Sequence, residues 1–414
     1  MGNVIKIAFR NLRRYQRRTL LTLSLITLGV VAVLLFLAVS GSFKQMMIGQ
    51  ITDAMLGHLQ IHQKGYLASI DTLPLNRNLN ERQAARVSET LASQPAVSAF
   101  SARIKLGAML SNYTETTNIR LNGIDPDQEL RTVPLLADRI LEGKADGLLA
   151  RGEILVPELL ARGMQLKPGD DVVLVATNQD GSVNGQSFVV RAIIEGVTGP
   201  GGRDGYIHRE DAQTLLRLDR PETSEFAVRL KDAGQLPAVL AALEESLGAV
   251  RNPAGKQVFE IHGWQKLTPF ANIARMIDLM TLFIRVMLVA IVLVSIMNVM
   301  VMAVYERIHE IGTIAAIGTS PGRILALFLT EGLLLGILGA AVGVAVSLVA
   351  TWALGLARIS FDFGQQKGLV LAPTLAPGEV VSVALIVIAI AVVGSLQPAW
   401  KAARMDPITA LRHV

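Results

Sequence analysis

The feature that most constrains this chain is a set of four long apolar segments. Residues 19–39, 286–304 and 380–396 contain no charged side chain, and residues 324–356 contain only one, Glu331. An α-helix rises about 1.5 Å per residue, so roughly 20 apolar residues cross the hydrocarbon core of a bilayer. The sequence therefore predicts four transmembrane helices.

Basic residues at the ends of these segments predict the orientation. Residues 1–18 contain Lys6, five arginines and no acidic residue, so the positive-inside rule places them in the cytoplasm. Ile5, Phe9 and Leu12 share one helical face, which predicts an amphipathic helix in the membrane interface. A cleaved signal peptide is the alternative, but the apolar segment exceeds the usual ~7–15 residues. Four crossings then place both termini in the cytoplasm.

The composition indicates two environments in one chain. Hydrophobic residues make up 51% of the sequence, yet 18% of the residues are charged, as expected for membrane spans joined to an aqueous domain. The absence of cysteine excludes a disulfide framework and thiolate metal sites. The basic residues gather at the ends of apolar segments, which argues against nucleic-acid binding.

The extracytoplasmic segment, residues 57–269, has an α+β pattern. β-rich stretches occur at residues 58–62, 103–110, 117–123, 171–177, 187–197, 225–230 and 257–262. Helical patterns occur at residues 81–93, 158–164, 209–218 and 236–247. The first and last strand–helix–strand groups are similar, so we expect them to form a membrane-proximal lobe with an outer lobe, about residues 121–223, inserted. Turn-rich residues 178–186 and 198–205 predict exposed loops.

The first two spans have apolar extensions on the outer side. Helical spacing predicts a first span with an outward stalk at residues 19–56 and a stalk with the second span at residues 270–304. Two ordinary interfacial helices are the alternative. The stalks carry residues that could form an apolar cargo surface or a dimer contact: Phe43, Met46, Met47, Met280 and Phe283.

A short polar stretch, residues 305–323, separates the second and third spans. Glu306, Arg307 and Glu310 can continue the second span, Gly312 begins a compact segment, and Ser320 with Pro321 predicts a new helix start. A partly apolar cytoplasmic helix needs a covering partner; a simple turn on the lipid headgroups is the alternative. The remaining boundaries are a third span at 324–356, an external loop at 357–379, a fourth span at 380–397 and a cytoplasmic tail at 398–414.

The third span carries a stripe of small residues and one carboxylate. Overlapping small-xxx-small steps allow a second helix to approach closely, at Gly332, Gly336, Gly339 and Gly343. An unpaired carboxylate is costly in lipid. Glu331 is therefore expected to pair with Arg323, to pair with a partner helix, or to be hydrated within reach of the headgroups. The hydrated state is the favoured interpretation.

Motifs for catalysis are absent from the sequence. There is no G-x-x-x-x-G-K-[ST] phosphate loop and no G-x-S-x-G elbow. His309-Glu310 begins like H-E-x-x-H, but Thr313 replaces the second histidine. His58 and His62 are interpreted as surface residues rather than metal ligands. We expect no catalytic residue, bound metal or cofactor here, with ATP and Mg²⁺ bound by a separate subunit.

Several sequence stretches resemble one protein family. "ERIHEIGTIAAIGTSPGRI" is similar to the E-R-x-x-E-I-G-x-x-x-A-x-G-A-x-x-x-x-I signature of the FtsX-like, or MacB-type (type VII), ABC transporter permeases, and "QPAWKAARMDPITALRHV" resembles their C-terminal ending. "GHLQIHQKGY", "NIRLNGIDP" and "ILVPELLARGMQLKPGDDVVLVA" resemble the LolC/LolE lipoprotein-release branch. Because the sequence contains no nucleotide-binding domain, it resembles the stand-alone permeases of the family rather than MacB itself.

The resemblance implies a membrane α-helical fold with a large α+β extracytoplasmic domain between spans 1 and 2, in a bacterial inner membrane. It implies that a second permease and two ATPase subunits bind, and that ATP hydrolysis drives outer-domain movements on a lipoprotein or other amphiphile. Efflux with a periplasmic adaptor and regulation of a cell-wall hydrolase are the alternatives. By position, the ATPase-coupling segment would comprise Glu306, Arg307, Glu310, Ile311, Gly312, Ala315, Gly318, Pro321 and Arg323.

Overall fold

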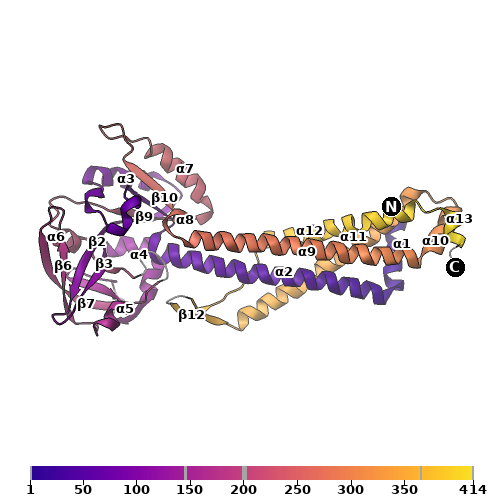
Figure 1. Cartoon of the computed structure of the whole chain (residues 1–414), viewed down its shortest axis with the longest axis horizontal. Coiled ribbons are helices and arrows are strands. Elements are labelled where there is room, and N and C mark those ends of the chain that lie inside the picture. The colour runs from indigo at the N-terminus through magenta and orange to yellow at the C-terminus, as the bar shows by residue number, and fades with distance from the viewer. Residues whose placement is uncertain (1, 144–146, 198–202, 364–365, 413–414) are drawn as a thin grey trace. The chain divides into compact units, whose positions relative to one another are not determined.

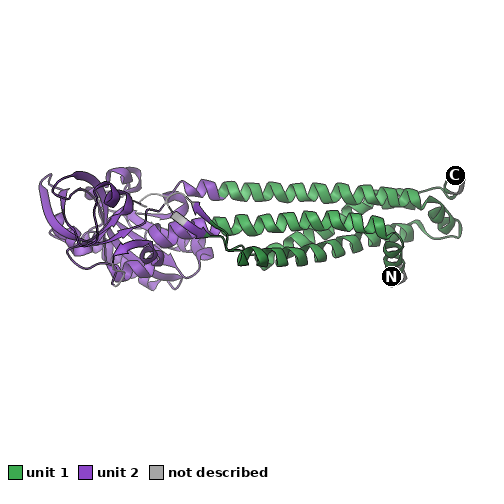
Figure 2. Cartoon of the chain, turned by 90° about the horizontal axis from the view of Figure 1, so that it is seen from below, with its two compact units in different colours: residues 1–44, 275–360, 370–414 green, residues 45–274, 361–369 purple. Residues whose placement is uncertain are grey.

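The computed structural model describes residues 2–143, 147–197, 203–363 and 366–412. The chain divides into two compact units, coloured separately in Figure 2. The membrane unit comprises residues 1–44, 275–360 and 370–414, and the outer unit comprises residues 45–274 and 361–369.

The membrane unit is helical, and its elements are labelled in Figure 1. Its helices are α1 (Gly2–Arg14), α2 (Gln16–Ile51), α9 (Phe270–Glu306), α10 (Ile308–Ala316), α11 (Pro321–Leu356), α12 (Pro377–Ala403) and α13 (Pro407–Arg412). Among the described residues, four helices are long and apolar enough to cross a membrane: α2 with the turn that follows it, α9, α11 and α12. The predicted number of spans is confirmed.

The spans pack through one face each. Buried side chains recur every three or four residues, which is the spacing of one helical face; on α2 they are Ile26, Val30 and Leu34. The opposite faces stay apolar but exposed, with Leu28 67% and Val294 57% accessible. An exposed apolar surface of this extent suits a lipid environment rather than water.

The outer unit is built on a mixed ten-stranded sheet in the order β10-β1-β9-β2-β3-β8-β5-β7-β4, with β6 pairing β2 and β7. The strands are β1 (Leu59–Gln63), β2 (Val97–Ser111), β3 (Thr116–Ile124), β4 (Ile140–Gly143), β5 (Glu153–Pro157), β6 (Asp171–Thr177), β7 (Val183–Ile194), β8 (Gly205–His208), β9 (Glu225–Leu230) and β10 (Phe259–Gly263). Its α-helices are α3 (Glu81–Ser93), α4 (Pro126–Thr132), α5 (Glu158–Gly163), α6 (Arg209–Leu215), α7 (Leu236–Ser246) and α8 (Trp264–Leu267). This is the α+β domain that the sequence predicts.

The long strand β2 joins two hydrophobic cores. Its first half pairs with β9 as far as Arg103, and its second half pairs with β3 from Ile104 onward. One core holds Leu59, Phe226 and Ile261, whereas the other begins at Ile104. The second core therefore starts earlier than the predicted lobe boundary near residue 121. Because β2 is continuous from Val97 to Ser111, its residues do not indicate where its pairing changes from β9 to β3.

Several elements of the outer unit differ from the predicted pattern. The helix α4 and the short strands β4, β5 and β8 were not predicted, and the expected external loop contains a two-stranded sheet, β11 (Ser360–Phe363) with β12 (Gln366–Val370). The predicted turn near residues 178–186 is present, because β6 ends at Thr177 and β7 begins at Val183. Most of the predicted loop at residues 198–205 lies outside the described residues.

Candidate functional site

The segment between the second and third spans is a separate short helix. The helix α9 ends at Glu306, and Arg307 has φ −118° and ψ 18°, values outside the α-helical region. The helix α10 then begins at Ile308. The helix α9 includes Glu306, as predicted, but the prediction that Arg307 and Glu310 also continue the second span, with a compact segment beginning at Gly312, is wrong. Gly312 lies buried inside α10.

Arg307 leaves the helical path and binds a buried carboxylate. Its Nη1 lies 2.9 Å from Oε1 of Glu331, which is only 1% exposed. The same oxygen accepts a hydrogen bond of 2.7 Å from Nδ2 of Asn11. The prediction of a hydrated Glu331, and the alternative pairing with Arg323, are both wrong. Arg323 lies on the same helix as Glu331, about two turns away. The guanidinium that pairs with Glu331 comes instead from Arg307, at the break before α10.

Further ion pairs connect this segment to the N-terminal helices. Nε of Arg307 lies 3.0 Å from Glu310 Oε2, and Arg14 Nη1 lies 3.4 Å from the other oxygen of Glu310. Nη1 of Arg18 lies 2.9 Å from Glu306. The exposed pairs contribute little to stability, so the buried Arg307–Glu331 contact is the main polar link between α10 and α11.

The helix α10 has one buried and one exposed apolar face. Ile311 and Gly312 are buried, and Ile311 joins a core with Val304 and Phe328. Ile314 is 39% exposed, and Ile317, the C-cap residue that follows α10, is 82% exposed. An isolated side chain as apolar and as exposed as Ile317 costs free energy in water. This face is available to a covering surface.

Glycine and proline set the ends of the segment. Gly318 has φ +98°, a conformation that glycine adopts without steric cost, and the N–H of Thr319 bonds back to the carbonyl of Ile314 in the manner of a helix C-cap. The helix α11 starts at Pro321 with Ser320 at the N-cap position, as predicted, although the Ser320 side chain makes no capping hydrogen bond. Ala315 is half-buried and Arg323 is exposed.

The glycine stripe of α11 contacts two different helices. A Cβ on Gly332 or Gly336 would collide with α12, at Ser395 and Ala391. A Cβ on Gly339 would lie 2.5 Å from Cγ2 of Ile26 on α2, and one on Gly343 would lie 2.7 Å from Val30. The small residues therefore allow close helix approach within this chain.

The five predicted stalk residues do not form one exposed surface. Met280 is 51% and Phe283 is 67% exposed, but Met47 is only 2% exposed and belongs to a core of the outer unit. Phe43 and Met46 are half-buried. The prediction of a cargo or dimer surface is wrong for Met47, because it lies one helical turn before the buried Ile51.

The outer unit holds a buried charged cluster that sequence reasoning missed. Arg103 lies between Glu129 and Glu225, at 2.6 and 2.9 Å, and Lys105 lies 3.6 Å from Glu225. Burial opposes ionisation of Glu225, yet Lys105, His62 and Arg103 together lower its pKa. His58 and His62 are 8% and 0% exposed, so their interpretation as surface histidines is wrong. The sequence signal for this cluster is the alternation of charged and apolar residues within β2, which could have predicted buried charges on one face of the strand.

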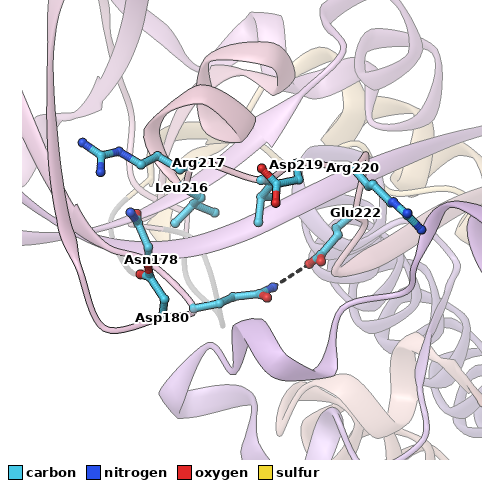
Figure 3. Close-up of a pocket in the computed structure, with 9 residues that line it drawn as sticks. Asn178, Asp180, Leu216, Arg217, Asp219, Arg220 and Glu222 are labelled. Atoms are coloured by element: carbon cyan, nitrogen blue, oxygen red, sulfur yellow. Dashed lines mark hydrogen bonds between the residues drawn. The ribbon is translucent and has the colours of Figure 1, made fainter.

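A polar pocket of about 360 Å³ lies in the outer unit (Figure 3). Arg217, Asp219 and Arg220 contribute to its wall, and Gln179 donates a hydrogen bond of 2.7 Å to Glu222. Its described lining residues include no Ser, Cys or His that could act as a nucleophile–base pair.

Comparison with known proteins decides the family. A model described as MacB-like periplasmic core domain matches residues 19–246, more than half of the chain, and one described as FtsX-like permease C-terminal matches residues 282–407. The chain belongs to the MacB-type, FtsX-like permease family. Its fold is the membrane α-helical, MacB-like architecture that the sequence predicts.

Two similar proteins have names that state a transport role. It is 24% identical over 432 residues to the lipoprotein-releasing system transmembrane protein LolC of Neisseria meningitidis serogroup B, with 98% of both chains covered. It is 24% identical over 428 residues to the macrolide export ATP-binding/permease protein MacB 1/2 of Paracoccus denitrificans, covering 100% of this chain and 59% of that protein. The crystal structure of the periplasmic region of MacB from Actinobacillus actinomycetemcomitans aligns at TM-score 0.34 and 12% identity, covering 50% of this chain and 89% of that one.

The permease is therefore a membrane protein of the LolC and MacB-type ABC family. Membership implies an ATPase partner, and permease subunits of such transporters are generally non-catalytic.

Proposed function

We propose that this permease couples ATP hydrolysis by a cytoplasmic ATPase to movements of its outer unit. The residues 305–323 form the coupling segment, and α10 is its contact element. Two ATPase subunits and a second permease, identical or homologous, complete the transporter. ATP and Mg²⁺ bind to the ATPase, and the permease transmits the conformational change without chemistry of its own.

The observation that carries the proposal is the way α10 is held. The buried pair of Arg307 and Glu331 fixes the helix from inside, while Ile317, 82% exposed, faces outward. A force applied to Ile317 reaches α11 through a buried ion pair and packed side chains rather than through a flexible loop. Coupling requires that ATPase binding favour one of two arrangements of the permease.

The proposed orientation of the permease in the membrane is based on the distribution of its basic residues. The exposed basic residues of α1, among them Lys6, Arg10 and Arg13, favour the cytoplasm by the positive-inside rule. Both termini and α10 are then cytoplasmic, and the outer unit lies in the periplasm. The membrane is the bacterial inner membrane.

The cargo that we favour is a lipoprotein or another amphiphile. The relative that matches nearly the whole chain over its own full length is named for lipoprotein release, and Met280 and Phe283 remain exposed on α9. The second candidate is efflux with a periplasmic adaptor, supported by the relative named for macrolide export.

The test is an interaction measurement on α10. Ile317→Asp places a charge where the proposal requires an apolar contact, so the ATPase that co-purifies with the tagged permease should fall at least tenfold. Leu159→Asp is the matched control, because Leu159 is 54% exposed on α5 of the outer unit. If both variants retained the ATPase equally, α10 would not be its docking element.

A further inference from the structure

A pocket of about 500 Å³ lies between α1, α10 and α11, within the membrane unit. Most of its lining is apolar: Ile7, Ile311, Ile314, Ile324, Leu327 and Phe328. Its volume is within the range of small-ligand sites, which are mostly apolar with a few placed polar groups. Ile7 and Ile314 are 40% and 39% exposed, so the pocket is accessible from outside.

Among the described residues that line the pocket, one cation has no ion-pair partner. Arg307 is balanced by Glu331, and Glu310 is balanced by Arg14. Arg323 also lines the pocket, is exposed, and forms no ion pair with any residue that the structure describes. The pocket therefore offers apolar walls and one uncompensated guanidinium, which favours a ligand with an anionic group.

Neighbouring basic residues strengthen this preference. Lys6 and Arg10 of α1 stand on either side of Ile7 in the sequence, and both are exposed. Neither has an ion-pair partner among the described residues. Each basic residue near an anionic membrane surface attracts it by about 1 kcal/mol, so these residues of α1 also favour an anionic membrane surface.

The pocket also lies at the boundary of the spans. The helix α10 separates α9 and α11, both long and apolar enough to cross a membrane, so it stands at one end of each. Lipid headgroups and the first part of the acyl chains occupy this level. A free anion would use Arg323 but would leave the apolar walls uncovered.

We propose that this pocket binds an anionic phospholipid, with its phosphate on Arg323 and an acyl chain against Leu327 and Ile314. The lipid contacts Arg323 and Ile314 of the coupling segment and leaves Ile317, which does not line the pocket, free for the ATPase. The proposal does not rest on the function proposed above, because it concerns the permease alone.

The experiment measures thermal unfolding of the purified full chain in detergent, without ATPase. Dihexanoyl-phosphatidylglycerol is titrated against dihexanoyl-phosphatidylcholine, and sodium phosphate is titrated separately. A ligand that binds only the folded state raises the midpoint with concentration. We expect the anionic lipid to stabilise the chain more than the zwitterionic lipid and more than phosphate.

Two variant pairs locate the effect. Leu327→Trp fills the pocket and should abolish the preference for phosphatidylglycerol, whereas Leu338→Trp, at a 38% exposed position of the same helix outside the pocket, should keep it. Arg323→Gln should weaken apparent affinity about fivefold, the factor that corresponds to roughly 1 kcal/mol. Arg82→Gln, at an exposed residue of α3, should leave affinity unchanged.

Three results would overturn the proposal: equal stabilisation by the two lipids, full reproduction of the effect by sodium phosphate, or retained preference in Leu327→Trp. The last would place the lipid elsewhere on the chain. If Leu327→Trp does not fold, the comparison of Arg323→Gln with Arg82→Gln decides, and equal affinities there would also reject the site.

Discussion

Glu331 is a buried carboxylate whose cation comes from the residue that follows the second span. A carboxylate at 1% exposure is costly unless a cation and hydrogen bonds compensate it. Arg307 lies at the break between α9 and α10 and supplies the cation, and Asn11 donates the second bond. The break between the two helices and the compensation of the buried carboxylate therefore meet at one residue.

Removing one member of this pair should be more damaging than removing both. Arg307→Met leaves Glu331 buried without its cation and is expected to cost about 3–5 kcal/mol, whereas Arg307→Met with Glu331→Met should recover most of that loss. Chemical unfolding of the purified permease measures the difference. Arg14→Met is the control, because its pair with Glu310 is exposed. Equal losses in the single and double variants would show that the pair is not a buried charge interaction.

His58 gives the outer unit a predictable response to pH. Its Nδ1 accepts the N–H of Leu230 at 2.9 Å, so the fold uses the neutral ring. Burial lowers the pKa of His58, opposed by Asp53 and assisted by Arg229. A pKa depressed in the folded state means that the unfolded chain binds the proton more readily, so stability is lost as pH falls below about 6.5.

We therefore expect the unfolding midpoint of the permease to decrease between pH 7.5 and 5.5, and His58→Gln to flatten that decrease. His309→Gln is the control, since His309 is exposed. Thermal scans across this pH range test the expectation. A steeper decrease in His58→Gln, or an equal flattening in His309→Gln, would contradict it.

At the scale of elements, local signals predict some helices and strands well. The helix α3 occupies residues 81–93 as predicted, because Asn80 and Gln83 form a capping box whose two residues are only three positions apart in sequence. The strand β8 has only four residues and pairs in parallel with β3. Such a strand is defined by partners distant in sequence, so its own residues do not predict it.

The packing of α11 can be tested at one glycine. Gly339→Ala would place its Cβ 2.5 Å from Ile26, so we expect α2 and α11 to separate at a cost of about 1–3 kcal/mol. Gly355→Ala is the control on the same helix, where a Cβ meets nothing within 4 Å. The change in the free energy of unfolding should therefore differ between the two variants, with the loss confined to Gly339→Ala. Equal stabilities would mean that the helices do not pack closely at Gly339.

For the whole molecule, the sequence predicts the four spans and the outer domain. It could not predict the partners of Glu331, because Asn11 lies 320 residues away in sequence and only the tertiary fold brings them together. The proposal that residues 305–323 contact an ATPase therefore rests on the family resemblance. The buried ion pair gives a physical reason why that segment can transmit force.

The central claim is that α10 faces a cytoplasmic ATPase while the outer unit does not. The direct measurement is photo-crosslinking in intact cells with a benzophenone amino acid placed at Ile317 or, as the control, at Leu159. The account predicts a covalent adduct with an ABC ATPase subunit from position 317 and none from position 159. An ATPase adduct from position 159, or none from position 317, would contradict it.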